Sequence, residues 1–166
     1  MLETYFKLLC DYNYWAHRRV WDCVMQLDEV QFTRALGPDR TSVHAQMAHV
    51  VGAEWLWINR LQGASPDRIL TVDDLPTREA IRARWDAVEA EVRAFVAGLD
   101  DEALLADVDY TTTRGTSQHE ACYALLGHLF NHGTDHRAQV LGLIGQLGGP
   151  TVEQDMLFYL REQASG

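Results

Sequence analysis

The chain has few of the features that mark secreted and membrane-spanning proteins. Its 166 residues include only three cysteines, Cys10, Cys23 and Cys122, an odd number without CxxC spacing, which does not suit a disulfide scaffold. No apolar run approaches the roughly 18 residues that a membrane-spanning helix needs. Residues 1–5 lack a basic stretch followed by an apolar core, so we expect no secretory signal. We therefore expect a cytoplasmic protein whose cysteines are reduced and buried.

Basic residues are also scarce relative to acidic ones. Lys plus Arg number 14 against 24 for Asp plus Glu, which gives a formal net charge of −10. A surface this acidic repels phosphate backbones and anionic lipids, so we expect no nucleic-acid partner and no membrane partner. Hydrophobic residues make up 47% of the chain, as in globular proteins. No repeat or linker divides the sequence, and we expect one domain over residues 1–166.

Four long segments repeat apolar residues with the period of an α-helix, and turn signals separate them. The expected helices are 2–27, 42–63, 77–99 and 118–148. The β-branched, alternating stretch at 106–118 predicts a short extended segment or hairpin before the fourth long helix. A short extra helix is expected at about 153–162. This order of elements predicts an all-α protein built as a four-helix bundle.

Three of the seven histidines, His128, His132 and His136, follow one another at four-residue intervals in the fourth helix. A four-residue step turns only about 40° around a helix, so two such imidazoles can reach one metal ion. His132 and His136 fall within the apolar stripe of this helix, where an unpaired imidazole is costly to bury. A shared metal ion satisfies both side chains. Two core histidines with polar partners are the alternative.

On the second helix, His49 lies among small residues such as Ala45, Gly52 and Ala53, which leave room for an ion and its ligand. Taken alone, His49 is more simply a core histidine. Glu54 lies on the opposite side of this helix, so we do not assign it to a metal. His128 either orients a ligand or is a boundary residue.

The remaining titratable residues have simpler interpretations. We expect the other three histidines at the surface or at helix ends; they are His17, His44 and His119. The acidic residues of the third helix are expected to form a solvated face; they are Asp86, Glu89 and Glu91. No cysteine lies in a basic cluster that would activate its thiol.

The stretch from His128 to Gln139, with the sequence HLFNHGTDHRAQ, resembles the signature helix of the DinB/YfiT-like family. Members of that family typically carry His, three residues, His, Arg, Gly or Ala, and Gln at these positions. Residues 12–17 are similar to the first helix of the family, 49–57 to its second-helix ligand segment and 155–160 to its C-terminal docking helix. One position departs from the pattern, because Asp135 stands where the family often has a further histidine.

The resemblance implies a four-helix bundle of up-down-down-up topology that assembles as a homodimer. It also implies a metal site with one histidine from the second helix and two from the fourth, which places the ligands at His49, His132 and His136. His128 and Gln139 are then the candidates for orienting those ligands. Asp135 faces about 100° away from His136, so we expect no loss of metal binding from the departure.

Three imidazoles with an open fourth position suit a divalent transition metal, zinc or nickel before others, that acts as a Lewis acid or activates water. Related families with this bundle include metal-dependent hydrolases and thiol S-transferases. The sequence therefore predicts a metal-dependent enzyme that acts on a small-molecule substrate, with a low-molecular-weight thiol as a further cofactor in the transferase case. The absence of HExxH and of an activated cysteine favours the external thiol. The alternative is a non-catalytic metal-binding or stress-response bundle, whose structural ion would need a fourth ligand such as His128.

Overall fold

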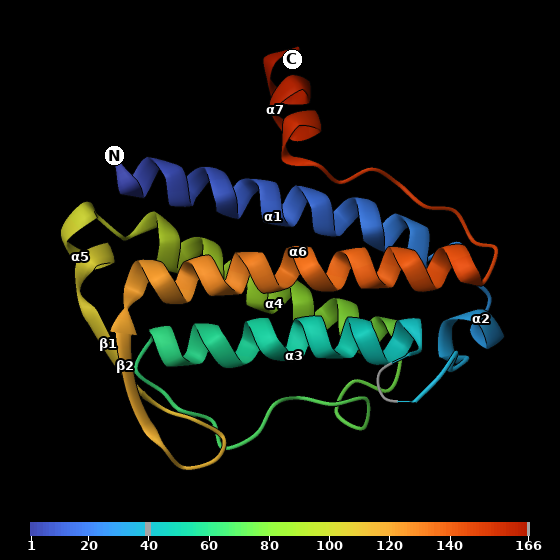
Figure 1. Cartoon of the computed structure of the whole chain (residues 1–166), viewed down its shortest axis with the longest axis horizontal. Helices are drawn as coiled ribbons and strands as arrows, with labels where there is room; N and C mark the ends of the chain where they lie inside the picture. Colours follow the sequence, from blue (N-terminus) through green and yellow to red (C-terminus); the bar gives the residue numbers. More distant parts are fainter. Residues whose placement is uncertain (39–40, 166) are drawn as a thin grey trace.

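Four long helices lie side by side in the computed structural model of the chain (Figure 1). The structure describes residues 1–38 and 41–165. The elements are α1 (Leu2–Val24), α2 (Glu29–Thr33), α3 (Val43–Leu61), α4 (Arg78–Ala97), α5 (Asp101–Leu105), β1 (Asp107–Thr111), β2 (Ser117–Ala121), α6 (Cys122–Gln146) and α7 (Met156–Ala164). The chain is thus mostly helical with one small two-stranded sheet, as the sequence predicts. Among the described residues, no helix combines the length and the apolar character needed to span a bilayer.

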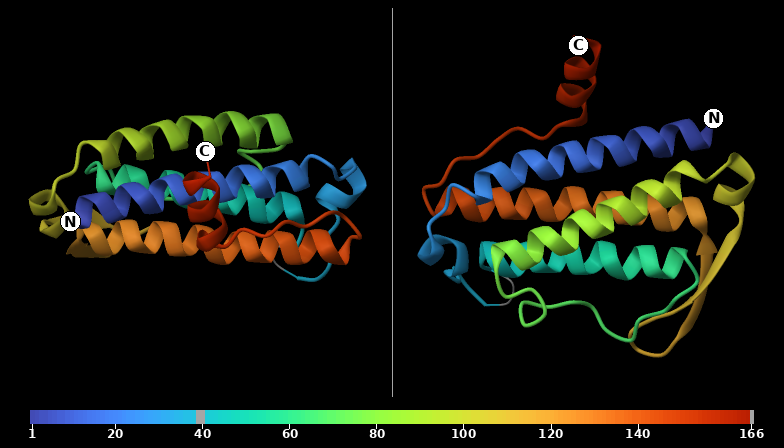
Figure 2. Two further views of the ribbon diagram at one scale, coloured as in Figure 1. Left: turned by 90° about the horizontal axis from the view of Figure 1, so that it is seen from above. Right: turned by 180° about the vertical axis from the view of Figure 1, so that it is seen from behind.

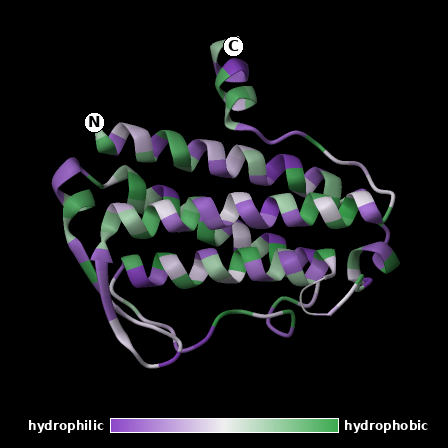
Figure 3. Cartoon of the chain, in the orientation of Figure 1, coloured by the Kyte–Doolittle hydropathy of each residue, from purple (hydrophilic) through white to green (hydrophobic). Residues whose placement is uncertain are grey.

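The long helices pack around a shared apolar core. Helix α6 lies in front of this core in Figure 1 and α4 behind it, as the turned views of Figure 2 show. Both α6 and α4 pack against α1 and α3, which lie between them. Hydrophobic segments occur along all four helices and alternate with hydrophilic ones (Figure 3). The buried apolar side chains of the four helices form one continuous cluster.

Side-chain caps begin two of the long helices where the sequence places them. Ser42 Oγ accepts a hydrogen bond from the Ala45 amide at 3.1 Å before α3, and Thr77 Oγ1 accepts one from the Ala80 amide at 3.2 Å before α4. Helix α6 ends two residues before Gly148, whose φ of +75° is the left-handed conformation that glycine adopts without strain.

Other boundaries differ from the sequence prediction. Helix α6 begins at Cys122 and not near residue 118, because 117–121 pairs in the expected hairpin as the antiparallel partner of 107–111. Helix α1 ends at Val24, and the unpredicted α2 follows with a capping box between Asp28 and Gln31. Helix α7 begins at Met156 instead of 153. The sequence also predicts a break in the chain at Gly37, Pro38 and Asp39, and the last of these lies outside the described residues.

The connection between α3 and α4 runs along α3 (Figure 1) and is internally braced. Arg68 donates two hydrogen bonds to the Asp74 carboxylate at 2.7 and 2.8 Å, and the same carboxylate accepts one from the Thr71 amide at 2.9 Å. The Leu70 carbonyl oxygen lies so close to α3 that a Cβ added at Gly52 would come within 2.6 Å of it. The absent side chain of Gly52 therefore lets this connection lie directly against the helix.

Replacing Gly52 with alanine is expected to lower the free energy of unfolding by about 1–3 kcal/mol, because the new methyl group meets backbone that must move. The matched control is Gly142→Ala in α6, where an added Cβ meets nothing within 4 Å. That variant should gain about 0.5–1 kcal/mol from the better helix former. Urea denaturation measures both. Equal stability of the two variants would contradict the close contact with Leu70.

Candidate metal centre

Helices α3 and α6 bring three histidines to one place. His49 comes from α3, and His132 and His136 come from successive turns of α6. One ring nitrogen from each of the three lies within 4.8 Å of the others. The ring centroids are 5.1 Å apart for His49 and His132, 4.5 Å for His49 and His136, and 4.2 Å for His132 and His136. In the part of the chain that the structure describes, no carboxylate or thiol joins this group.

A chain of amide side chains holds the ring of His136. Its Nδ1 lies 3.0 Å from Gln46 Oε1, Gln46 Nε2 donates to Gln139 Oε1 at 2.8 Å, and Gln139 Nε2 donates to Asp135 at 3.1 Å. A carboxylate only accepts hydrogen bonds, so Asp135 fixes the orientation of both amides in turn. Gln46 Oε1 then faces His136 as an acceptor. The proton of the neutral ring therefore sits on Nδ1, and Nε2 carries the lone pair that a metal ligand needs.

His132 is held in the neutral form. Burial lowers its pKa to about 4, and the neighbouring His136 and His128 contribute in the same direction. The neutral imidazole is the form that binds a metal ion, because a protonated ring has no lone pair to offer. At neutral pH this side chain is thus ready to act as a ligand without first losing a proton.

The two residues predicted to orient the ligands, His128 and Gln139, differ in how they lie relative to the histidine cluster. The exposed His128 packs edge-on against Trp57 at 4.8 Å between centroids, and its ring lies 5.8 Å from that of His132. Gln139 reaches His136 through Gln46. Sequence reasoning missed Gln46, although its position three residues before His49 on the same helix was a usable signal.

Comparison with known proteins places this chain in a family. The family model described as "DinB family" matches residues 1–165. The chain belongs to the DinB family. It is also 22% identical, over 170 residues that cover 96% of this chain and 95% of the relative, to the protein named "Protein DinB" of Bacillus subtilis (strain 168).

One of the remaining histidines of this DinB-family chain lies deep in the core, contrary to the sequence prediction. His17 is 1% exposed, with Nε2 2.8 Å from Glu54 Oε1 and its ring edge-on to Trp85. His44 is half-buried beside Phe32 and donates to the Leu75 carbonyl oxygen at 2.8 Å. His119 is exposed on β2, as expected.

Glu54 is the centre of a buried polar network that links three helices. Its Oε1 accepts hydrogen bonds from His17 at 2.8 Å and from Asn13 Nδ2 at 3.1 Å, both on α1. Asn13 Oδ1 in turn accepts from the guanidinium of Arg137 on α6 at 2.5 Å. Arg137 also donates to Gln154 at 2.7 Å, which ties the network to the segment before α7. Glu54 therefore points toward α1 and away from the histidine cluster, as the helix geometry predicts.

The surroundings of each ionisable group in this network favour one protonation state. Burial raises the pKa of Glu54, but the electrostatic attraction and hydrogen bond of His17, the hydrogen bond from Asn13 and the charge of Arg137 outweigh it, and the pKa falls below its ordinary value. Burial lowers the pKa of His17, and Arg137 lowers it further against the opposing effect of Glu54. Since arginine stays protonated, the network holds a carboxylate, a guanidinium and a neutral imidazole that donates its Nε2 proton to Glu54.

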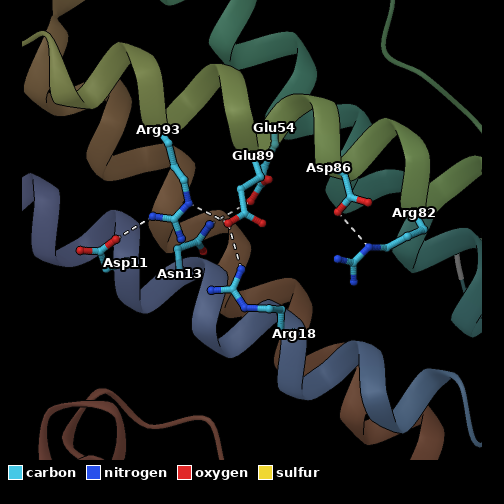
Figure 4. A network of polar contacts seen from close by, with 8 residues as sticks. All are labelled: Asp11, Asn13, Arg18, Glu54, Arg82, Asp86, Glu89 and Arg93. Carbon is cyan, nitrogen blue, oxygen red and sulfur yellow. Dashed lines mark hydrogen bonds and ion pairs between the residues drawn. The ribbon is translucent and has the colours of Figure 1, made fainter. Parts of the chain in front are cut away.

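Helices α1 and α4 are joined by a separate set of ion pairs nearer the surface (Figure 4). Arg93 pairs with Glu89 at 2.7 Å and with Asp11 at 2.6 Å, and Glu89 also pairs with Arg18 at 2.9 Å. The side chain of Glu89 is only 18% exposed, so it belongs to a helix contact and not to the solvated face expected of it. Asp86 is exposed and pairs within α4, in keeping with the prediction.

Replacing Glu54 with glutamine should cost about 3–5 kcal/mol of unfolding free energy, because the buried cation of Arg137 loses its counter-charge. The matched control is Glu29→Gln, which removes the carboxylate partner of Arg78 but lies 73% exposed. That change should cost at most about 1 kcal/mol. Denaturant titration of both variants tests this. A cost below about 1 kcal/mol for Glu54→Gln would show that the network carries no ionic interaction.

Acid should destabilise the metal-free protein from about pH 6.5 downward. The unfolded chain protonates His17 near pH 6.5, whereas the folded chain excludes that proton because its His17 pKa is lowered. The unfolded state thus binds more protons, and the free energy of unfolding falls as the pH falls. The slope is at most about 1.4 kcal/mol per pH unit for one proton.

Urea denaturation at several pH values in the presence of a chelator measures this slope. His17→Gln should reduce it between pH 6 and pH 5, while the exposed His119→Gln should not. His132, with its pKa of about 4, contributes in the same direction and remains in both variants. An unchanged slope for His17→Gln would mean that His17 titrates alike in the folded and unfolded chain.

Proposed function

We propose that this DinB-family protein is a metal-dependent enzyme that acts on a small molecule, by thiol transfer or by hydrolysis. His49, His132 and His136 hold one divalent transition metal ion, zinc or nickel before others. The observation that carries the proposal is the meeting of three imidazole nitrogens within 4.8 Å, without a carboxylate or thiol among the described residues of the group. Three neutral nitrogen donors suit these ions and leave coordination positions for substrate or water.

The surroundings of the three histidines fit a metal ion. Gln46 fixes the proton of His136 on Nδ1, which leaves Nε2 as the ligand atom. Burial keeps His132 neutral. When bound, the ion supplies Lewis acidity and lowers the pKa of a coordinated water or thiol. Within this centre, the protein's own side chains serve to hold and orient ligands.

The nucleophile of a thiol-transfer reaction would come from outside the chain. All three cysteines are buried. Burial raises the pKa of Cys10 to about 12 and that of Cys122 to about 11, so neither forms a thiolate at neutral pH. Glu54, the carboxylate five residues after His49, is occupied by His17 and Asn13 and faces α1. Because the described residues place neither a thiolate nor a carboxylate base at the centre, we favour a low-molecular-weight thiol as co-substrate over hydrolysis.

Our proposal extends to the domain organisation, the helix topology and the assembly of the protein. We take residues 1–166 as one domain with up-down-down-up topology, which the course of the four long helices in Figures 1 and 2 supports. We also propose a homodimer. Helix α7 packs on α1 through Tyr159, projects outward from there (Figure 1), and leaves Leu157 61% and Phe158 37% exposed, an apolar surface that a second copy can cover. Sedimentation velocity tests this assembly, and a monomer at micromolar concentration would contradict it.

Elemental analysis of the tag-free protein should find about one equivalent of a transition metal, and none in the His132→Ala/His136→Ala double variant.

Gln46→Leu should weaken metal affinity by about 10–100-fold, because His136 loses the partner that orients it. His128→Ala separates the two interpretations of the site. Unchanged affinity supports three ligands and an open position, whereas a loss like that of the double variant supports a closed, structural ion.

Catalysis is tested on the same samples. The metal-loaded protein should turn over members of a panel of small thiols with electrophiles, or of simple esters and amides, and the double variant should not. Metal binding without metal-dependent turnover across that panel would favour the non-catalytic alternative. No metal in the wild-type protein after reconstitution with zinc and with nickel would refute the site itself.

A further inference from the structure

A small cavity adjoins the histidine cluster. It has a volume of about 200 Å³ and is lined by Ala45, Ala48 and His49 of α3 and by residues 69–72 of the connection that follows this helix. His49 is half-buried and forms part of the wall. The cavity therefore opens beside one of the three candidate ligands.

As far as the described residues form it, the wall of this cavity is mostly apolar and carries no charged side chain. Besides His49, its side chains are two alanines, Ile69, Leu70, Thr71 and Val72. An uncharged wall gives no partner to a carboxylate, phosphate or ammonium group, and burying such a group there would be costly. A hydrocarbon group gains free energy by entering it. The chemistry of the wall thus selects for an aliphatic or cyclic hydrocarbon group.

The wall is preformed on both sides. The alanines belong to the regular helix α3, where small side chains create the space. The opposite wall is held by the two hydrogen bonds from Arg68 to Asp74, by the Thr71 amide on the same carboxylate, and by the contact of Leu70 with Gly52. A site that exists before the ligand arrives loses little conformational entropy on binding.

We propose that this cavity is the specificity pocket of the metal centre and takes a compact hydrocarbon group of the small-molecule substrate, while the reacting group of that substrate lies at the histidines. This inference rests on the proposed function. An apolar cavity of about 150 Å³ accommodates benzene, so the pocket suits a branched or cyclic group of about five or six carbons. Ala45 and Ile69, one from each wall, set its size.

Straight-chain 1-alkanols from methanol to octanol are the probe for the pocket alone, and methyl NMR shifts of Ala45, Ala48 and Ile69 report binding. Affinity should rise about four-fold for each added methylene and stop rising near five or six carbons. Ala45→Leu fills the pocket and should weaken hexanol binding at least ten-fold. The control Ala87→Leu lies on the exposed face of α4 and should change nothing. Ile69→Ala enlarges the pocket and should move the plateau to longer chains.

Alkyl hydroxamates, whose head group chelates metal ions, test the link between pocket and histidines in the zinc-loaded protein. Hexanohydroxamate should bind more tightly than acetohydroxamate, and Ala45→Leu should remove this difference while leaving acetohydroxamate binding intact. Equal affinity of both hydroxamates in the wild type, or an unchanged difference in Ala45→Leu, would overturn the inference. Binding of alkanols without binding of either hydroxamate would support the pocket and refute the metal centre, so the two failures are distinguishable.

Discussion

Helices α3 and α6 pack along one another, and the histidine cluster depends on this contact. Two of its members lie on α6 and one on α3, so neither helix holds the set alone. The contact also places Gln46 where it can reach His136, because the amide extends from α3 to α6. A rotation of either helix by one residue, about 100°, would separate the three imidazoles.

The orientation of α6 is fixed from two sides. His136 faces α3 and Arg137, the next residue, faces α1, since neighbouring helical residues point about 100° apart. Glycine at position 133 allows the second contact, because a Cβ there would come within 2.8 Å of Asn13 Oδ1. The buried network of Glu54 and Arg137 is costly to desolvate, and its benefit to the site lies in holding one arrangement of three helices.

The packing of these helices also keeps the buried ionic network apart from the histidine cluster. The carboxylate and the guanidinium are paired with each other through Asn13, away from the cluster. His49, one of the three histidines, lies instead beside small and apolar side chains from α3 and the connection after it. A neutral, partly apolar environment of this kind keeps imidazoles unprotonated and strengthens electrostatic interactions with whatever binds there.

Local patterns in the sequence predicted the long helices and singled out the pair His132 and His136, whereas His49 was added to them by the family resemblance. Apolar periodicity and caps such as Ser42, Thr77 and Gly148 are local signals, because they depend on residues within one or two turns. The spacing of His132 and His136 is equally local. Tertiary structure alone decided that His17 is buried against Glu54, that Gln46 holds His136, and that residues 69–72 close a pocket beside His49. These contacts join residues far apart in the chain, and their partners are set by how the helices pack, which no local pattern specifies.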